Sequence, residues 1–207
     1  SRGLGDVYKR QINMGSTITY YYMLDDPGTY LYHCHVEATE HMQMGMLGNL
    51  YVRPAQNRAP AQTFPNGWNH SPGMTYAYND LDGSTFYHRE YALQLSSFDS
   101  DFHDASENVA PLPFAEMRPK YAMINGRGYP DTVLEAPIAN TYNGFEGQVL
   151  AAKVVAVQGE RTLLRISSVD VHREFTLQLD GFPMRTIGKD ARLLRARLPG
   201  TGNNVFI

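Results

Sequence analysis

The sequence predicts an all-β protein, and three observations support this prediction. Short runs rich in β-branched and aromatic residues recur along the chain, separated by clusters of Gly, Pro, Asn and Asp. Several of these runs alternate apolar and polar residues, as a half-buried strand does. The chain shows no helical periodicity. Strands at this spacing, with turns between them, favour a β-sandwich.

The composition limits the class of protein and its partners. A chain of 207 residues, with 43% hydrophobic and 19% charged residues, fits one or two folded domains. The net charge of -3 and a basic run near the end without stacking aromatics argue against a nucleic-acid partner. No apolar run is long enough to span a membrane. The single Cys excludes an internal disulfide.

The first eleven residues, Ser1–Gln11, look unlike the rest of the chain. The string GDVYKRQ within them resembles an adapter-derived translation artefact found at the ends of environmental sequence assemblies. We therefore expect residues 1–11 to be non-native and exclude them from fold reasoning. The natural chain would then begin near Ile12, already inside a domain.

Residues 12–54 predict three strands around one turn and one loop. Asp25–Gly28 is the turn, because Pro27 fixes φ and Gly28 permits positive φ. The expected strands are Ser16–Met23, Thr29–His35 and Leu47–Val52, with a loop over Val36–Gly45. Three strands are too few to close a sandwich, so we expect only the C-terminal part of a domain here.

Residues 55–75 are rich in Pro, Asn and Gly and predict an ordered linker in which Phe64 and Trp68 pack and His70 is exposed. A second domain is expected over residues 76–207. Its predicted strands are Phe86–Leu95, Tyr121–Ile124, Val149–Val157, Arg161–Ser167, Glu174–Leu179 and Pro183–Ile187. Asp99–Asp104 is read as a solvated acidic loop, with a Mn(II) or Ca(II) site as the alternative.

The stretch Gly28–Leu50 concentrates metal-binding side chains. It holds the only Cys, three of the seven His, and three methionines. One thiolate, imidazoles and a nearby thioether are the donor set of a blue-copper site. The alternatives are an inert buried Cys and a structural zinc site, although structural zinc sites usually carry two or more Cys.

The order His33-Cys34-His35 has a physical reason. Successive side chains of a strand point to opposite sides, so Cys34 would face one way and both His the other. Cys34 would then bind copper on its own side, while the two imidazoles reach a second metal centre. An electron at the Cys34 sulfur would need only a short covalent path to either His.

These residues resemble the last copper motif of the multicopper oxidases, the laccase-like family. The resemblance rests on His33-Cys34-His35, His41 and Gly45-Met46, preceded by the strand GTYLY. The second half resembles the family's second cupredoxin, or plastocyanin-like, domain in Gln158–Ile166 and Asp180–Met184. The resemblance implies cupredoxin-like Greek-key β-sandwiches, the first present only as its C-terminal strands and the second incomplete at its C-terminus.

The resemblance also implies roles for the metal ligands. Cys34 and His41 would be type 1 copper ligands with Met46 as the axial ligand, and His33 and His35 would bind the type 3 pair of a trinuclear cluster. The interval from Cys34 to His41 is two residues longer than in common laccases, so the loop must bulge. The alternatives for the axial role are Met42 and Met44.

Other ligands of the resembled family are absent from this sequence. His33 and His35 form the only pair at positions i and i+2, and His70, His88, His103 and His172 are isolated. We expect His172 to be structural. We also expect that this chain alone cannot complete the trinuclear cluster and is inactive. The resemblance offers homo-oligomerisation as one way of completing it.

The resemblance implies a copper oxidoreductase that couples one-electron oxidation of a phenol, an aromatic amine or a metal ion to four-electron reduction of O2 to water. It also implies a periplasmic or secreted location. One alternative is a copper nitrite reductase, against which His35 argues. Another is a non-catalytic blue-copper electron-transfer protein, which would leave His33 and His35 without a role.

Overall fold

The computed structural model describes residues 12–139, 144–197 and 204–206; the predicted artefact, residues 1–11, lies outside this part. Most of the regular structure is strand, so the predicted all-β class is confirmed. The Greek-key order and the division into domains remain predictions. Among the described residues, no helix is both long enough and apolar enough to cross a membrane.

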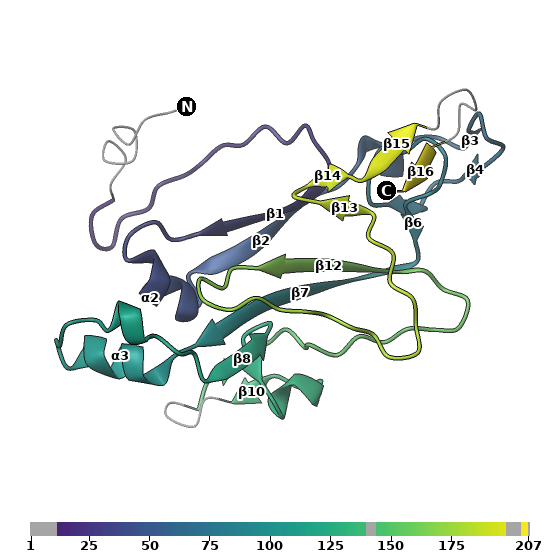
Figure 1. The fold of residues 1–207 in the computed structure, drawn as a ribbon. Helices are drawn as coiled ribbons and strands as arrows, with labels where there is room; N and C mark the ends of the chain where they lie inside the picture. Colours follow the sequence, from purple (N-terminus) through teal and green to yellow (C-terminus); the bar gives the residue numbers. More distant parts are fainter. Residues whose placement is uncertain (1–11, 140–143, 198–203, 207) are drawn as a thin grey trace.

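The first structural unit is an antiparallel pair formed by β1 (Gly28–His33) and β2 (Leu47–Val52). Tyr32 lies opposite Gly48, and a Cβ on Gly48 would stand 2.4 Å from the Tyr32 hydroxyl oxygen. The missing side chain therefore makes room for the aromatic ring. Helix α2 (Ala38–Gln43) lies in the connection between the two strands, where a loop was expected (Figure 1).

The second unit is a mixed sheet with the strand order β12-β7-β8-β9, in which β9 is the short edge strand Arg127–Gly128. Its longest strand, β7 (Arg89–Phe98), pairs antiparallel with β8 (Tyr121–Ile124) and parallel with β12 (Thr162–Ser168). Of the predicted strands Val149–Val157 and Arg161–Ser167, the first is wrong, because residues 149–157 form no strand, whereas the second lies largely within β12, which pairs with β7. The chain makes a crossover connection of the kind that parallel strands require.

The remaining elements are short. The strands are β3 (Gln62–Thr63), β4 (Asn69–His70), β5 (Thr75–Tyr76), β6 (Phe86–Tyr87), β9 (Arg127–Gly128), β10 (Ile138–Ala139), β11 (Glu146–Gly147), β13 (Gly188–Lys189), β14 (Arg192–Leu193), β15 (Arg195–Arg197) and β16 (Asn204–Phe206). The helical elements are α3 (Ser100–Glu107) and the 3-10 turns Ala55–Arg58, Phe114–Glu116 and Asp131–Val133.

Three further predicted strands do not form. Ser16–Met23, Glu174–Leu179 and Pro183–Ile187 have no ladder partner among the described residues, and Tyr21 and Met23 are 92% and 88% exposed. A β-branched or aromatic run becomes a strand only where another strand pairs with it. Conversely, the expected acidic loop is helix α3, because the Asp99 carboxylate accepts hydrogen bonds from the backbone N–H groups of Asp101 and Phe102.

The segment before β7 contains an aromatic cluster, as predicted for Phe64 and Trp68. Phe64 is buried, and Trp68 packs against Phe86 and donates a hydrogen bond to the Tyr76 hydroxyl. The expected exposure of His70 is wrong. His70 is 2% exposed, and its ring hydrogen-bonds the Tyr76 hydroxyl and the backbone carbonyl of Ala59.

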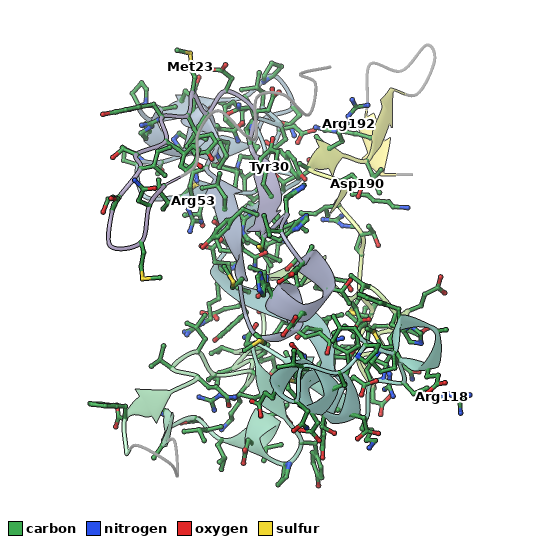
Figure 2. The ribbon with its side chains drawn as sticks, turned by 90° about the vertical axis from the view of Figure 1, so that its left-hand side faces the viewer. Met23, Tyr30, Arg53, Arg118, Asp190 and Arg192 are labelled. Atoms are coloured by element: carbon green, nitrogen blue, oxygen red, sulfur yellow. The ribbon has the colours of Figure 1, made fainter. Side chains whose placement is uncertain are left out.

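An ionic network around the buried Arg165 side chain joins the β1–β2 pair to the mixed sheet. Arg165 on β12 donates from Nε to Glu90 on β7 at 2.9 Å and from Nη1 to Thr29 on β1 at 3.0 Å. Arg53, which follows β2, pairs with the other oxygen of Glu90. Figure 2 labels Tyr30 on β1 and Arg53 just after β2, and Figure 1 shows the strand pair lying along β12 and β7.

The β13–β14 turn packs against the beginning of β1. A Cβ on Gly28 would stand 2.8 Å from the Ala191 Cβ, so only glycine allows this approach. Tyr30, Asp190 and Arg192 border an open cavity of about 520 Å³ here (Figure 2). This cavity is at the start of β1, whereas Cys34 follows its end.

Candidate metal centre

Cys34 and Met46 face each other just beyond the ends of β1 and β2. The Cys34 N–H donates to the Met46 carbonyl at 3.0 Å, which extends the antiparallel pairing by one bond. The Met46 N–H donates to the His41 carbonyl at 2.9 Å, so the backbone after α2 turns back onto the helix. Gly45 between them has a φ of 96°, a conformation that favours glycine. Backbone geometry therefore gathers Cys34, His41 and Met46 at one end of the hairpin.

The closest pair of donor side chains is Cys34 and His41. The Cys34 Sγ lies 3.3 Å from the His41 Nδ1, and the Val36 N–H points to the same sulfur at 3.4 Å. The hydrogen bond from His41, followed by the backbone contacts, lowers the pKa of the Cys34 thiol. The same contact raises the pKa of His41. Both shifts favour a thiolate next to an imidazolium, and the thiolate is the form that binds metals.

The separation of these two donors fits one shared metal ion. Bond lengths of about 2.3 Å to sulfur and about 2.0 Å to imidazole nitrogen, as for zinc, place tetrahedral donors about 3.5 Å apart. The observed 3.3 Å is close to this value. A thiolate and an imidazole also suit copper.

The three methionines differ in exposure. Met42 is buried, whereas Met44 and Met46 are 65% and 54% exposed. Met46 adjoins Cys34 through the backbone hydrogen bond, and Met44 ends α2 as its C-terminal cap. The exposed thioethers of Met44 and Met46 are accessible to an ion, whereas the buried thioether of Met42 contributes to the core.

The rings of His33 and His35 lie together. They stack with centroids 4.6 Å apart and an interplanar angle of 13°. Strand β1 ends at His33, before the expected position, yet the two rings still share one side of the chain. His33 Nδ1 also contacts the Cys34 carbonyl oxygen at 2.9 Å.

Within the described residues, no group of three or more His, Cys, Asp or Glu side chains is arranged to hold a metal ion. The acidic residues around His103 have other partners: Asp99 caps α3 and Asp101 pairs with Lys120. His88 accepts a hydrogen bond from the Arg161 N–H. The candidate donors therefore come from the Cys34 region, with the pair Cys34–His41 as its centre.

Sequence reasoning missed the helix that carries His41. The residues after Cys34 were expected to form a bulging loop, but Ala38–Gln43 is helical and Glu37 before it has a φ of 48°. The extra residues between Cys34 and His41 are thus taken up by a helical turn. Helix-forming residues such as Ala38, Glu40 and Gln43 were the available signal.

Comparison with protein-family models gives one match, over residues 7–56, to the model described as "Multicopper oxidase". The matched residues contain β1, α2, β2 and all five candidate ligands Cys34, His41, Met46, His33 and His35. Comparisons with curated proteins and with solved structures give no significant match.

Proposed function

We propose that this chain, whose residues 7–56 match the multicopper oxidase family model, supplies the type 1 copper motif of a copper oxidoreductase. Cys34 and His41 are the proposed equatorial ligands, and Met46 is the proposed axial ligand. The contact between Cys34 Sγ and His41 Nδ1 at 3.3 Å carries this proposal. It brings a sulfur and a nitrogen donor to the separation that a shared ion requires.

Bound copper would supply one-electron redox chemistry. The chain's part is to keep Cys34 Sγ and His41 Nδ1 close to one position, with the Val36 N–H directed at the sulfur. Cys34 is covalently continuous with His33 and His35. A short path through the backbone therefore leads from the sulfur to either ring, and the stacking of the two rings places them side by side.

The proposed reaction is one-electron oxidation of a phenol, an aromatic amine or a metal ion, coupled to four-electron reduction of O2 to water. His33 and His35 would contribute to a type 2/type 3 trinuclear cluster, whose other ligands would come from outside the described residues. Homo-oligomerisation is one source of such ligands. A periplasmic or extracellular location is proposed from the family.

Two other functions use part of the same site. A copper nitrite reductase would need one His before the Cys, and a blue-copper electron carrier would need neither flanking His. The stacking of His35 on His33 favours the oxidase, because it presents two imidazoles side by side where each alternative leaves at least one of them without a role.

The proposal is tested by titrating the chain with Cu(II) and recording visible absorption and electron paramagnetic resonance. We expect a weak thiolate-to-copper charge-transfer band, because the described donors fill only part of a type 1 shell, and no oxidase activity from the chain alone. Cys34→Ser and His41→Ala should abolish the band. His172→Ala, a matched change outside the candidate site, should leave it unchanged. A Cys34→Ser variant with the wild-type copper spectrum would overturn the proposal.

A further inference from the structure

Helix α2 presents two faces to different parts of the molecule. His41 points to the Cys34 sulfur. Glu40 and Gln43, three positions apart, share another face, and His41 lies roughly 100° from Glu40 around the helix axis. Both Glu40 and Gln43 contact residues that follow β7, beyond position 98.

Gln43 makes the most extensive of these contacts. Its Oε1 accepts the Asp99 N–H at 2.9 Å and lies 3.1 Å from His103 Nε2, while its Nε2 donates to the Met117 sulfur at 3.6 Å. One amide side chain therefore uses both its acceptor and its donor on residues that follow β7.

Glu40 adds a second anchor one helical turn earlier. Its Oε1 accepts a hydrogen bond from the Ser106 hydroxyl at 2.6 Å. Met42, between the two anchors, is 8% exposed and packs near Ser96 and Val169. Figure 1 shows α2 lying over α3, at the end of β7.

The residues on and around α3 that contact Glu40 and Gln43 are themselves fixed by other contacts. The Asp99 carboxylate caps α3 and also accepts the Arg118 N–H at 2.6 Å. The His103 ring stacks on Phe98 with centroids 4.3 Å apart. Burial lowers the pKa of His103. We call Asp99, His103, Ser106 and Met117 the α3 socket.

Helix α2 needs such support. It has only six residues and no side-chain hydrogen bond at its N-cap, and isolated helices of this length are not stable in water. Tertiary contacts must therefore fix its position. We propose that the α3 socket positions α2, through Glu40 and Gln43, and so sets the placement of the copper ligand His41. Glu40 and Gln43 are thus positioning residues of the metal centre, and this inference rests on the proposed copper function.

The test compares full-length variants by two measurements. The first is hydrogen exchange of the α2 amides in the metal-free chain, for example the His41 N–H, which bonds the Glu37 carbonyl. The second is a titration with Co(II), a redox-inert probe, followed by the thiolate-to-cobalt charge-transfer band. The disrupting variants are Gln43→Ala and the double variant Gln43→Ala/Ser106→Ala.

Loss of these hydrogen bonds should speed α2 exchange roughly fivefold to thirtyfold. Co(II) affinity should fall roughly tenfold to a hundredfold, as for other residues that orient metal ligands, and the band should shift. Gln43→Glu keeps the acceptor for the Asp99 N–H and loses the donor to the Met117 sulfur, so both measurements should lie between those of wild type and Gln43→Ala. Ser100→Ala, the same change elsewhere on α3, should behave as wild type. Thermal unfolding verifies that each variant is folded at the assay temperature.

The outcomes separate the two proposals. Wild-type exchange, affinity and band in the folded double variant would overturn the positioning role of the α3 socket and leave the copper proposal standing. A wild-type chain without any thiolate-to-metal band would overturn the copper proposal. Faster α2 exchange in the double variant would then still support the socket as the device that holds α2.

Discussion

Removing the Glu90 carboxylate should destabilise the protein strongly. Glu90 Oε2 accepts from Arg165 Nε at 2.9 Å and from the Tyr87 hydroxyl at 3.0 Å, and Arg53 pairs with Oε1. The Arg165 side chain is 4% exposed, so Glu90→Ala would leave a buried guanidinium without its carboxylate. Breaking a buried pair from one side costs about 3–5 kcal/mol. Because Glu90 itself is 24% exposed, we expect the lower end, about 3 kcal/mol.

The dependence on pH provides a second signature of this network. Burial raises the pKa of Glu90, but the contacts with Arg53 and Arg165 outweigh burial and hold it below the ordinary value. A carboxyl whose folded pKa is depressed stabilises the fold above its unfolded pKa and loses this contribution as the pH falls through the folded pKa. The stability difference between wild type and Glu90→Gln should therefore shrink on the acid side of the ordinary Glu range.

Urea unfolding monitored by tryptophan fluorescence at neutral and acidic pH measures both effects. Glu135→Ala is the matched control, because Glu135 pairs with Lys153 on the surface and its removal should leave the midpoint unchanged within error. A cost of less than about 1 kcal/mol for Glu90→Ala at neutral pH would refute the reasoning from burial. If the difference in stability between wild type and Glu90→Gln grew as the pH fell, the conclusion that folding lowers the pKa of Glu90 would be refuted.

Three further predictions follow from single side chains. Asp80→Ala should cost about 3 kcal/mol in thermal unfolding, because the 8% exposed carboxylate accepts five hydrogen bonds, whereas an exposed Asp104→Ala should not. Gly83→Ala should lower the melting temperature, since φ is +76° and the new Cβ would stand 2.3 Å from the Trp68 ring. In the metal-free chain at neutral pH, iodoacetamide should alkylate Cys34 faster than free cysteine, because its pKa is lowered by His41, and His41→Ala should slow the reaction.

The local sequence was sufficient to predict the hairpin around the metal motif. The Pro-Gly turn, the β-rich run up to His33 and the run after Met46 predict β1 and β2, and both strands form. These signals are local, because turn residues and strand formers act on their own backbone. The candidate metal ligands could also be recognised from the sequence, because the chemistry of a donor set depends on residue types and their spacing.

Pairing over long distances was not predictable from the same signals. Ser16–Met23 has strand formers as good as those of β1 but no partner strand among the described residues, whereas β12 pairs in parallel with a strand more than sixty residues earlier. Strand propensity describes how well a residue fits a sheet and does not say which strand will be its neighbour.

The sequence by itself determined the fold class, the β1–β2 hairpin and the set of candidate copper ligands, because each depends on residue type and local spacing. Only the tertiary structure decided that His41 stands on a short helix, that Glu40 and Gln43 anchor this helix on α3, and that Arg165 is buried between Glu90 and Thr29. A six-residue helix and a buried guanidinium are stable only where distant residues contact them. Those contacts exist only once the chain has folded.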